Sequence, residues 1–336
     1  MSATITTASL SEQVQAIEAG AEVTGIGWLG TTAALALGDG AVMLAREGET
    51  RRVEAHPDSG ILVAAADGKR LLTGGDDGRL VVTTADGNAT TLAETGGAWI
   101  DALALHPSGA VAYAARRKVT ARDEKGRSKT FEAPSTARGL AFAPKGYRLA
   151  VAHYNGVSLW YPNLETKPES LEWKGSHLDV TWSPDGRFVV TSMQENALHG
   201  WRLQPDRGHM RMSGYGAKPR STAWSFGGAW LATSGAEAAI IWPFASKEGP
   251  TGKPPRECGV RPARVTRVAF HPSVNVLAVG YEDSCVILIR LEDNSELLVR
   301  RAVPGNPVTA LAWDAKGQNI AFGCRDGTAG ILSLAG

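Results

Sequence analysis

The sequence has 336 residues, and 43% of them are hydrophobic, which is normal for a globular protein and excludes a largely disordered chain. Lys and Arg number 35, and Asp and Glu number 34. This balance argues against a nucleic-acid-binding protein that relies on bulk charge, although it leaves a local basic patch open.

The cysteines and the N-terminal residues show no pattern of zinc binding or secretion. Cys258, Cys285 and Cys324 lie far apart and form no CxxC pair, so we expect no structural zinc site and a reducing compartment. Residues 1–20 lack the basic and apolar regions of a signal peptide. No apolar run approaches the roughly 20 residues that span a bilayer. The sequence therefore predicts a cytoplasmic protein.

A short pattern recurs along the chain: an apolar residue, a small residue, an apolar or aromatic residue, then a turn. The copies begin about 36–46 residues apart, a spacing typical of repeat architectures. The eight copies lie at Ile26–Thr32, Leu62–Gly68, Leu103–Gly109, Leu140–Gly146, Val180–Gly186, Thr222–Gly228, Val268–Val274 and Leu311–Gly317. The first two copies are the weakest.

Each copy is followed by a second apolar strand, a tight turn and a third apolar strand. The turns include Asp39-Gly40, Asp77-Gly78, Asn155-Gly156 and Asp326-Gly327, and these residue types suit hairpins because they tolerate positive φ. In the third copy, Arg116-Arg117-Lys118 replaces the turn. A bulky apolar residue follows each turn in the third strand, and we expect three of these residues, Trp160, Trp201 and Trp242, to be buried.

This three-strand repeat resembles the repeat of the WD40 family over nearly the whole chain. Two family signatures are missing. The Trp-Asp pair is never intact, because the three tryptophans precede Tyr161, Arg202 and Pro243. No Gly-His pair lies in register, and we interpret His56, His106 and His271 as turn residues. The polar His–Ser/Thr–Trp–Asp network of the family is therefore expected to be mostly absent.

The resemblance implies an all-β, closed β-propeller of four-stranded blades, formed by residues 1–336 as a single domain and a monomer. The last copy supplies only three strands, so Val14–Ala19 is expected to complete its blade. This makes residues 13–19 an N-terminal closing strand and residues 20–336 the blades. Eight copies predict eight blades. Seven is the alternative, if the copy at Ile26 or Leu62 is irregular.

The same resemblance implies a non-enzymatic protein-interaction scaffold without cofactor or metal. The sequence contains no GxSxG, P-loop or HExxH motif. The alternative function is a small-molecule-binding or enzymatic propeller that uses its central channel. RNA binding through basic loops is a weaker option, because the net charge is near zero.

In such a blade, the outer-to-inner loops and the second-to-third turns lie on one face. Arg, Trp and Tyr in these loops are the residue types that most often carry interface energy. We therefore predict that this face docks an acidic segment of a protein partner, with a merely solvated surface as the alternative. The candidate partner-binding residues are Trp99, Arg116, Arg117, Arg138, Tyr154, His177, Arg220, Arg264, Tyr281 and Arg325. The rival site is the opposite face, with Phe226, Trp230 and Phe244.

Overall fold

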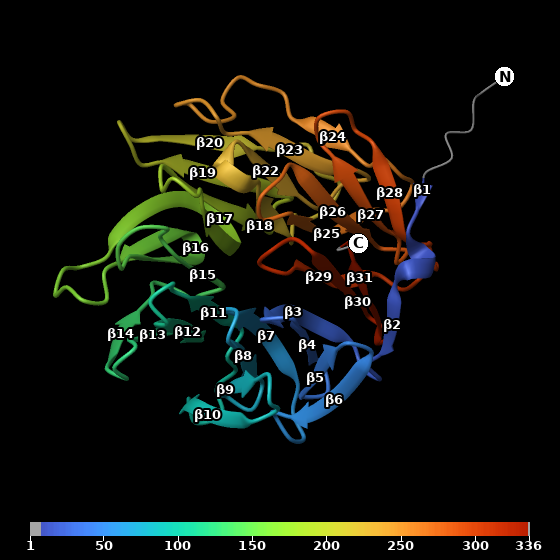
Figure 1. Cartoon of the computed structure of the whole chain (residues 1–336). Coiled ribbons are helices and arrows are strands. Elements are labelled where there is room, and N and C mark those ends of the chain that lie inside the picture. Colours follow the sequence, from blue (N-terminus) through green and yellow to red (C-terminus); the bar gives the residue numbers. More distant parts are fainter. Residues whose placement is uncertain (1–7, 335–336) are drawn as a thin grey trace.

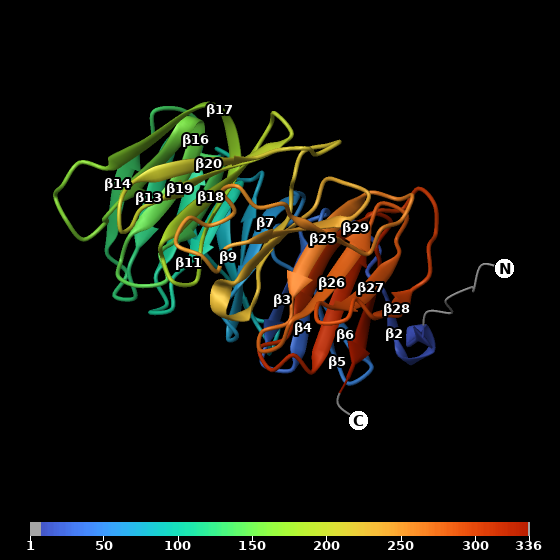
Figure 2. The ribbon, with the colours of Figure 1, turned by 90° about the horizontal axis from the view of Figure 1, so that it is seen from above.

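A computed structural model of the chain describes residues 8–334. These residues form 31 β-strands and two short 3-10 helices, η1 (Ser11–Gln13) and η2 (Phe226–Gly228). The strands are arranged as sheets around a ring (Figure 1), and β25 to β28 run side by side when the ring is viewed after a 90° turn (Figure 2). This is the all-β propeller architecture predicted from the repeat.

The first three sheets are four-stranded antiparallel meanders, each running from an inner to an outer strand. The first sheet consists of β3 (Val23–Leu29), β4 (Thr32–Leu37), β5 (Ala41–Arg46) and β6 (Glu49–Glu54). The second consists of β7 (Ile61–Ala66), β8 (Arg70–Gly75), β9 (Arg79–Thr84) and β10 (Ala89–Glu94). The third consists of β11 (Ala102–Leu105), β12 (Val111–Ala115), β13 (Lys118–Arg122) and β14 (Ser128–Glu132).

The fourth sheet has six strands, and the three that follow it have four, five and four. The fourth consists of β15 (Gly139–Phe142), β16 (Leu149–Trp160), β17 (Glu169–Trp182), β18 (Phe188–Met193), β19 (Ala197–Arg202) and β20 (Gly208–Met212). The fifth consists of β21 (Thr222–Trp224), β22 (Trp230–Thr233), β23 (Ala239–Pro243) and β24 (Arg256–Cys258). The sixth consists of β25 (Val265–Phe270), β26 (Val276–Tyr281), β27 (Val286–Arg290) and β28 (Glu296–Arg300), with β1 (Ala8–Ser9) added in parallel to β28. The seventh consists of β29 (Val308–Trp313), β30 (Asn319–Cys324), β31 (Thr328–Ser333) and β2 (Gln15–Glu18).

The prediction of eight separate four-stranded blades is wrong, because residues 8–334 form seven sheets. The two copies suspected of irregularity, at Ile26 and Leu62, form ordinary strands in β3 and β7. The difference instead arises in β17, which pairs with β16 through its first half and with β18 through its second half. The copies at Leu140 and Val180 therefore share the six-stranded fourth sheet.

The continuity of β17 has a local cause at Ser176, where a loop between sheets was expected. The Ser176 N–H donates to the Glu195 carboxylate at 3.1 Å, and its carbonyl accepts the Gln194 N–H at 2.9 Å. The preceding Gly175 N–H donates to the Asn155 side-chain oxygen at 3.2 Å. These partners satisfy the backbone of the connection in an extended conformation, so no loop separates the two parts of the sheet.

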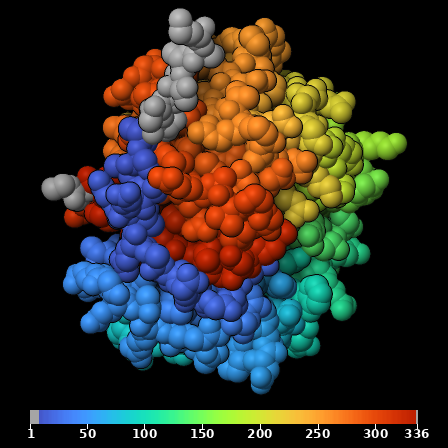
Figure 3. Space-filling model, turned by 90° about the vertical axis from the view of Figure 1, so that its right-hand side faces the viewer, coloured from blue at the N-terminus to red at the C-terminus, as the bar shows by residue number. Residues whose placement is uncertain are grey.

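The ring closes through the N-terminal segment. Val14–Ala19 was expected to complete the last sheet. Within this segment, β2 pairs antiparallel with β31, and Ile17 lies opposite Ala329. Figure 3 shows this segment, in blue, lying against the C-terminal strands, in red. On the inner side, β3 contacts both β7 and β29. The first and seventh sheets are thus joined by contact between their inner strands and by the chain that runs from β2, the outer strand of the seventh, to β3 of the first.

The core lies between neighbouring sheets, so each sheet is buried on both faces. Val23 and Leu35 of the first sheet pack in one cluster with Ala310 and Ala321 of the seventh. The predicted third-strand tryptophans, Trp160, Trp201 and Trp242, are 6%, 6% and 7% exposed, which confirms their burial. Burial of apolar surface against two neighbours is what stabilises a sheet of this kind, because no sheet can cover both faces alone.

Candidate functional site

One face of the ring carries the connections between successive sheets and the turns between second and third strands. Both sets lie on one side because neighbouring strands are antiparallel, so the start of the inner strand and the end of the second strand coincide. We call this side the loop face. Its turns adopt the left-handed conformation that the sequence predicted, with φ of 91° at Gly40 and 75° at Gly78. In the irregular third sheet, Arg116 takes this role with φ of 57°.

The loop face contains a cavity of about 1160 Å³ near the last three sheets. It is formed by the connections that precede β21, β25 and β29 and by turns of the fifth to seventh sheets. The charged side chains at its wall are five cations and three carboxylates, namely Lys218, Arg220, Arg264, Arg267, Arg325, Glu22, Glu282 and Asp283. We call it the loop-face cavity.

Two of these guanidinium groups differ in how they are held. Arg264 lies at the exposed rim, where its Nη1 is 3.7 Å from the Glu282 carboxylate. Arg267 lies deeper, on the inner strand β25, and its Nε and Nη1 donate to the carbonyl oxygens of Thr309 and Thr266 at 2.6 and 2.9 Å. Burial lowers the pKa of Arg267, and nearby Arg220 lowers it further, while Glu22 opposes both effects. The deep part of the cavity is therefore electropositive.

The structure brings three of the ten candidate residues together at the loop-face cavity: Arg220, Arg264 and Arg325. Sequence reasoning missed Arg267, which directly precedes the copy at Val268–Val274. An arginine on an innermost strand otherwise rich in small apolar residues was the signal that pointed to it.

Five other candidates lie on the loop face at the third and fourth sheets, away from the cavity. Trp99 and Tyr154 are 62% and 53% exposed. Arg116 is exposed, while Arg117 donates to the Ala133 carbonyl at 2.9 Å. Arg138 forms an ion pair with Asp101 at 2.7 Å, so part of its charge is already neutralised.

The last two candidates, His177 and Tyr281, are fully buried and cannot contact a partner at this surface. The His177 ring bonds Thr191 at 2.7 Å and the Trp173 carbonyl at 2.9 Å, and burial lowers its pKa. The Tyr281 hydroxyl donates to the Gly259 carbonyl, and burial raises its pKa. Their assignment to the partner-binding surface is therefore wrong, because both side chains turn inward to satisfy buried polar groups.

Comparison with known proteins places these features in a family. The family model described as Anaphase-promoting complex subunit 4 WD40 domain matches residues 268–335. Protein HIR1 from Cryptococcus neoformans var. neoformans serotype D is 26% identical over 193 residues, which cover 48% of this chain and 21% of HIR1. Meiotic recombination protein rec14 from Schizosaccharomyces pombe is 30% identical over 104 residues, which cover 30% of this chain and 34% of rec14. The chain spans well under half the length of either curated relative.

Solved structures show the same fold at low sequence identity. The computationally designed Ika8 protein has a TM-score of 0.76 and 17% identity, with 94% of this chain and 96% of that chain covered. The WD40 repeats of RRP9 give a TM-score of 0.61 and 14% identity, with 81% and 94% covered. U3-55K gives a TM-score of 0.61 and 14% identity, with 82% and 95% covered. Residues 268–335 thus match a WD40 domain model, and the chain has the β-propeller fold of these solved structures.

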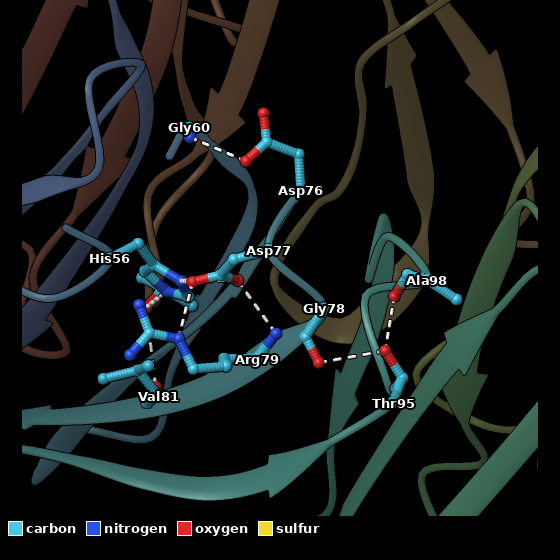
Figure 4. Close-up of polar contacts among 10 residues, drawn as sticks. His56, Gly60, Asp76, Asp77, Gly78, Arg79, Val81, Thr95 and Ala98 are labelled. Carbon is cyan, nitrogen blue, oxygen red and sulfur yellow. Dashed lines mark hydrogen bonds and ion pairs between the residues drawn. The ribbon is translucent and has the colours of Figure 1, made fainter. Parts of the chain in front are cut away.

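The polar network of WD40 repeats is present in the second sheet, where sequence reasoning did not expect it. His56 is fully buried, and its Nδ1 lies 3.0 Å from an Asp77 carboxylate oxygen (Figure 4). Its Nε2 lies 2.9 Å from the Thr73 hydroxyl. Burial raises the pKa of Asp77, but hydrogen bonds from the Arg79 backbone and side chain and from His56 outweigh it and lower the pKa overall. His56 does begin a turn, because its carbonyl accepts the Ser59 N–H at 3.2 Å, but the interpretation as a turn residue missed the network that its side chain forms.

A variant of this WD40 network holds the fifth sheet. The Tyr215 hydroxyl is 2.7 Å from the Thr233 hydroxyl, and the Trp242 indole N–H donates to Tyr215 at 2.6 Å. Tyrosine here occupies the place of the family histidine, between two sheets. In the second sheet, the sequence signal for the network was an Asp in the turn 21 residues after His56. This signal is present even though the Gly-His and Trp-Asp pairs are not intact.

No group of three His, Cys, Asp or Glu side chains in residues 8–334 is placed to hold a metal ion. No helix in the same residues is long and apolar enough to cross a membrane.

Proposed function

We propose that this propeller is a non-catalytic scaffold that docks an acidic segment of a protein partner on its loop face. The observation that carries the proposal is the loop-face cavity, where Lys218, Arg220 and Arg325 form no ion pair with any carboxylate of residues 8–334. Guanidinium groups bind carboxylates through paired hydrogen bonds, so unpaired arginines around one hollow favour an acidic ligand.

The exposed aromatic residues extend this surface beyond the cavity. Trp99 and Tyr154 project from the third and fourth sheets of the same face, and such residues contribute desolvated contact area at interfaces. Because the loops are short and held by a rigid ring, little conformational entropy is lost when a partner orders them.

The opposite face offers a poorer site than its sequence suggested. Phe226 is 65% exposed, but Phe244 is only 1% exposed and packs against Phe188 and Trp224. Trp230 is partly buried beneath the Arg256 guanidinium, at 5.6 Å. A single exposed phenylalanine does not form an apolar patch of the size that marks an interface.

We further propose that the scaffold acts as a monomer in the cytoplasm. The cysteines Cys258, Cys285 and Cys324 are free and buried, which fits a reducing compartment, where disulfides are rare. Light scattering of the purified chain at increasing concentration tests the monomer, and fluorescence imaging of the tagged chain in its native cell tests the location.

The docking proposal is tested by charge reversal on the two faces. Partners are first captured from native cells with the wild-type chain, identified by mass spectrometry and purified. Binding is then measured for the double variant Arg220→Glu/Arg264→Glu and for the matched control Lys145→Glu/Lys316→Glu, whose exposed lysines lie in first-to-second-strand turns on the opposite face. We expect the first variant to weaken binding at least tenfold and the control to leave it within about twofold.

The dependence of binding on ionic strength and a variant on the opposite face complete this test. Docking on the loop face weakens as ionic strength rises, because exposed charges are screened over about 8–10 Å at physiological salt. If Trp230→Ala abolishes binding while the Arg220 and Arg264 reversals leave it unchanged, the partner docks on the opposite face and the proposal is wrong.

A further inference from the structure

Arg267 is a fixed cation in the wall of the loop-face cavity. Its Nε and Nη1 are committed to the Thr309 and Thr266 carbonyl oxygens, which hold the guanidinium plane in one orientation. Neutral carbonyls satisfy these two donors without neutralising the charge, and Arg267 forms no ion pair with a carboxylate of residues 8–334. The charge is therefore positioned, and Glu22 near it balances the charge only in part, because the pKa of Arg267 is still lowered overall.

The surroundings make this imbalance unfavourable in the unliganded protein. Arg220 lies near enough to depress the pKa of Arg267, and enclosure by the ring has the larger effect in the same direction. A buried charge is costly unless it is paired. An anion entering the cavity interacts with both guanidinium groups at once, so the site gains more from a carboxylate than an exposed arginine does.

The size and shape of the cavity favour a peptide over a free anion. Pockets for small ligands usually measure about 300–1,000 Å³, and this cavity is about 1160 Å³ and open to the surface. Its uncharged wall is formed largely by small residues that leave the backbone accessible, including Gly216, Ala217, Ala263 and Gly305. An extended chain can approach such residues closely, whereas a single small anion would contact only a fraction of the wall.

We propose that an aspartate or glutamate side chain of the docked segment enters the loop-face cavity and pairs with Arg267, with Arg220 beside it. This inference rests on the proposed function and specifies its anchor. Arg264 has a secondary role at the rim, because Glu282 already lies 3.7 Å from it. Arg267 thus selects an acidic residue at one position of the partner, while the rim charges steer the approach.

The experiment uses the full chain and a defined probe, fluorescein-labelled hexaglutamate, with hexaglutamine as its neutral counterpart. Fluorescence anisotropy gives the Kd for the wild type, for Arg267→Gln, for the charge-retaining Arg267→Lys and for Arg46→Gln, an exposed arginine on the opposite face. Arg267→Gln should weaken hexaglutamate binding about tenfold or more, as expected for a charge-assisted hydrogen bond. Arg267→Lys should recover part of the loss, and Arg46→Gln should change the Kd less than about twofold.

Three outcomes separate the inference from the proposed function. If hexaglutamate binds no better than hexaglutamine, the acidic-segment proposal itself is wrong. If Arg220→Glu/Arg264→Glu abolishes hexaglutamate binding but Arg267→Gln leaves it unchanged, the face is right and the anchor is wrong. If inorganic tripolyphosphate binds more tightly than hexaglutamate, the cavity is a site for a free anion, and the peptide inference fails.

A second measurement keeps the inference testable if Arg267→Gln does not fold. Phenylglyoxal modifies accessible arginines, and mass spectrometry maps the modified positions in the wild-type chain. Saturating hexaglutamate should slow modification of Arg267 several-fold and leave Arg46, on the opposite face, unaffected. Equal rates at Arg267 with and without hexaglutamate would overturn the inference.

Discussion

The indole Nε1 of Trp28, on the inner strand of the first sheet, donates a 3.1 Å hydrogen bond to the carbonyl oxygen of Ala312 on the seventh sheet. Trp182 and Trp313 make the same type of bond, to the carbonyl oxygens of Ala141 and Ala269 at 3.0 and 3.1 Å. Each bond joins the inner strands of neighbouring repeat copies. The Trp28 bond connects the two ends of the chain, so it contributes to closure of the ring.

Substitution Trp28→Phe retains an aromatic ring but removes this donor. We expect a loss of about 1 kcal/mol in the free energy of unfolding, the usual net value of a hydrogen bond, measured by urea denaturation. Trp99→Phe is the control, because Trp99 is 62% exposed and surface substitutions usually change stability by less than about 0.5 kcal/mol. Losses of equal size in both variants would contradict a role of the Trp28–Ala312 bond in closure.

Removal of residues 1–20 deletes β2 and leaves β31 as an unpaired edge. We expect a drop of roughly 5 °C or more in the melting temperature, because backbone pairing and the burial of Ile17 are lost. Exposed edge strands also promote association, so light scattering should rise. Removal of residues 1–7 alone is the control, because it spares β1, η1 and β2. A full-length melting temperature in the longer deletion would mean that β2 does not stabilise the ring.

The three buried third-strand tryptophans should each contribute strongly to stability. Truncation of Trp160, Trp201 or Trp242 to Ala should cost about 3–5 kcal/mol, because a large cavity is left between sheets. Chemical denaturation measures the loss, and Trp99→Ala provides the exposed control. Losses below about 1 kcal/mol at all three positions are incompatible with the packing seen between the sheets.

Local sequence patterns were sufficient to predict most strands and turns. The Asp-Gly pairs lie at hairpin turns because glycine tolerates the positive φ found at Gly40 and Gly78, and Trp160 is buried because its repeat position faces a neighbouring sheet. The union of two repeat copies in the fourth sheet was not predictable from these patterns. It depends on Glu195 reaching the Ser176 N–H from a turn of the adjoining strands, which is a tertiary contact.

The candidate site was also predictable only in part, because local patterns place its loops but not its tertiary contacts. The loop face follows from strand order alone, so Arg220, Arg264 and Arg325 were placed correctly at one surface. Tyr281 was misplaced because its hydroxyl finds the Gly259 carbonyl in the connection before β25, and no local pattern encodes that partner. Arg267 was missed because it lies just before the copy at Val268–Val274, at a position to which the repeat pattern gave no role.

The buried pair of His56 and Asp77 should contribute more to the free energy of unfolding than an exposed ion pair at the equivalent turn of another sheet. Asp77→Ala leaves the fully buried His56 Nδ1 without its carboxylate partner, so we expect a loss of about 2–3 kcal/mol in the free energy of unfolding. Asp39→Ala is the matched control, because Asp39 holds the same turn position in the first sheet and pairs with Arg52, with both side chains more than a third exposed. Its loss should stay below about 1 kcal/mol. Comparable losses at the two positions would show that the buried network adds nothing.

Asp179 provides a test by pH. It lies on the inner part of β17, where its side chain is exposed to solvent but the surrounding strands desolvate the carboxyl and raise its pKa from 3.8 to about 6, even though the Val180 N–H bond opposes the shift. A raised carboxyl pKa means that the folded state binds the proton more readily than the unfolded state. The resulting destabilisation is present above pH 6 and is relieved as the pH falls through 6 towards 3.8.

Substitution Asp179→Asn removes this ionisation while keeping the shape of the side chain. The variant should melt a few degrees higher than the wild type at about pH 7.5, where the native carboxyl is charged. The difference should be smaller at about pH 5 and disappear only towards pH 3.8, because the unfolded carboxyl stays charged until then. Glu248→Gln, an exposed substitution in the loop before β24, should leave both melting temperatures unchanged. If Asp179→Asn shifts the melting temperature equally at the two pH values, the charge of Asp179 is not what destabilises the ring.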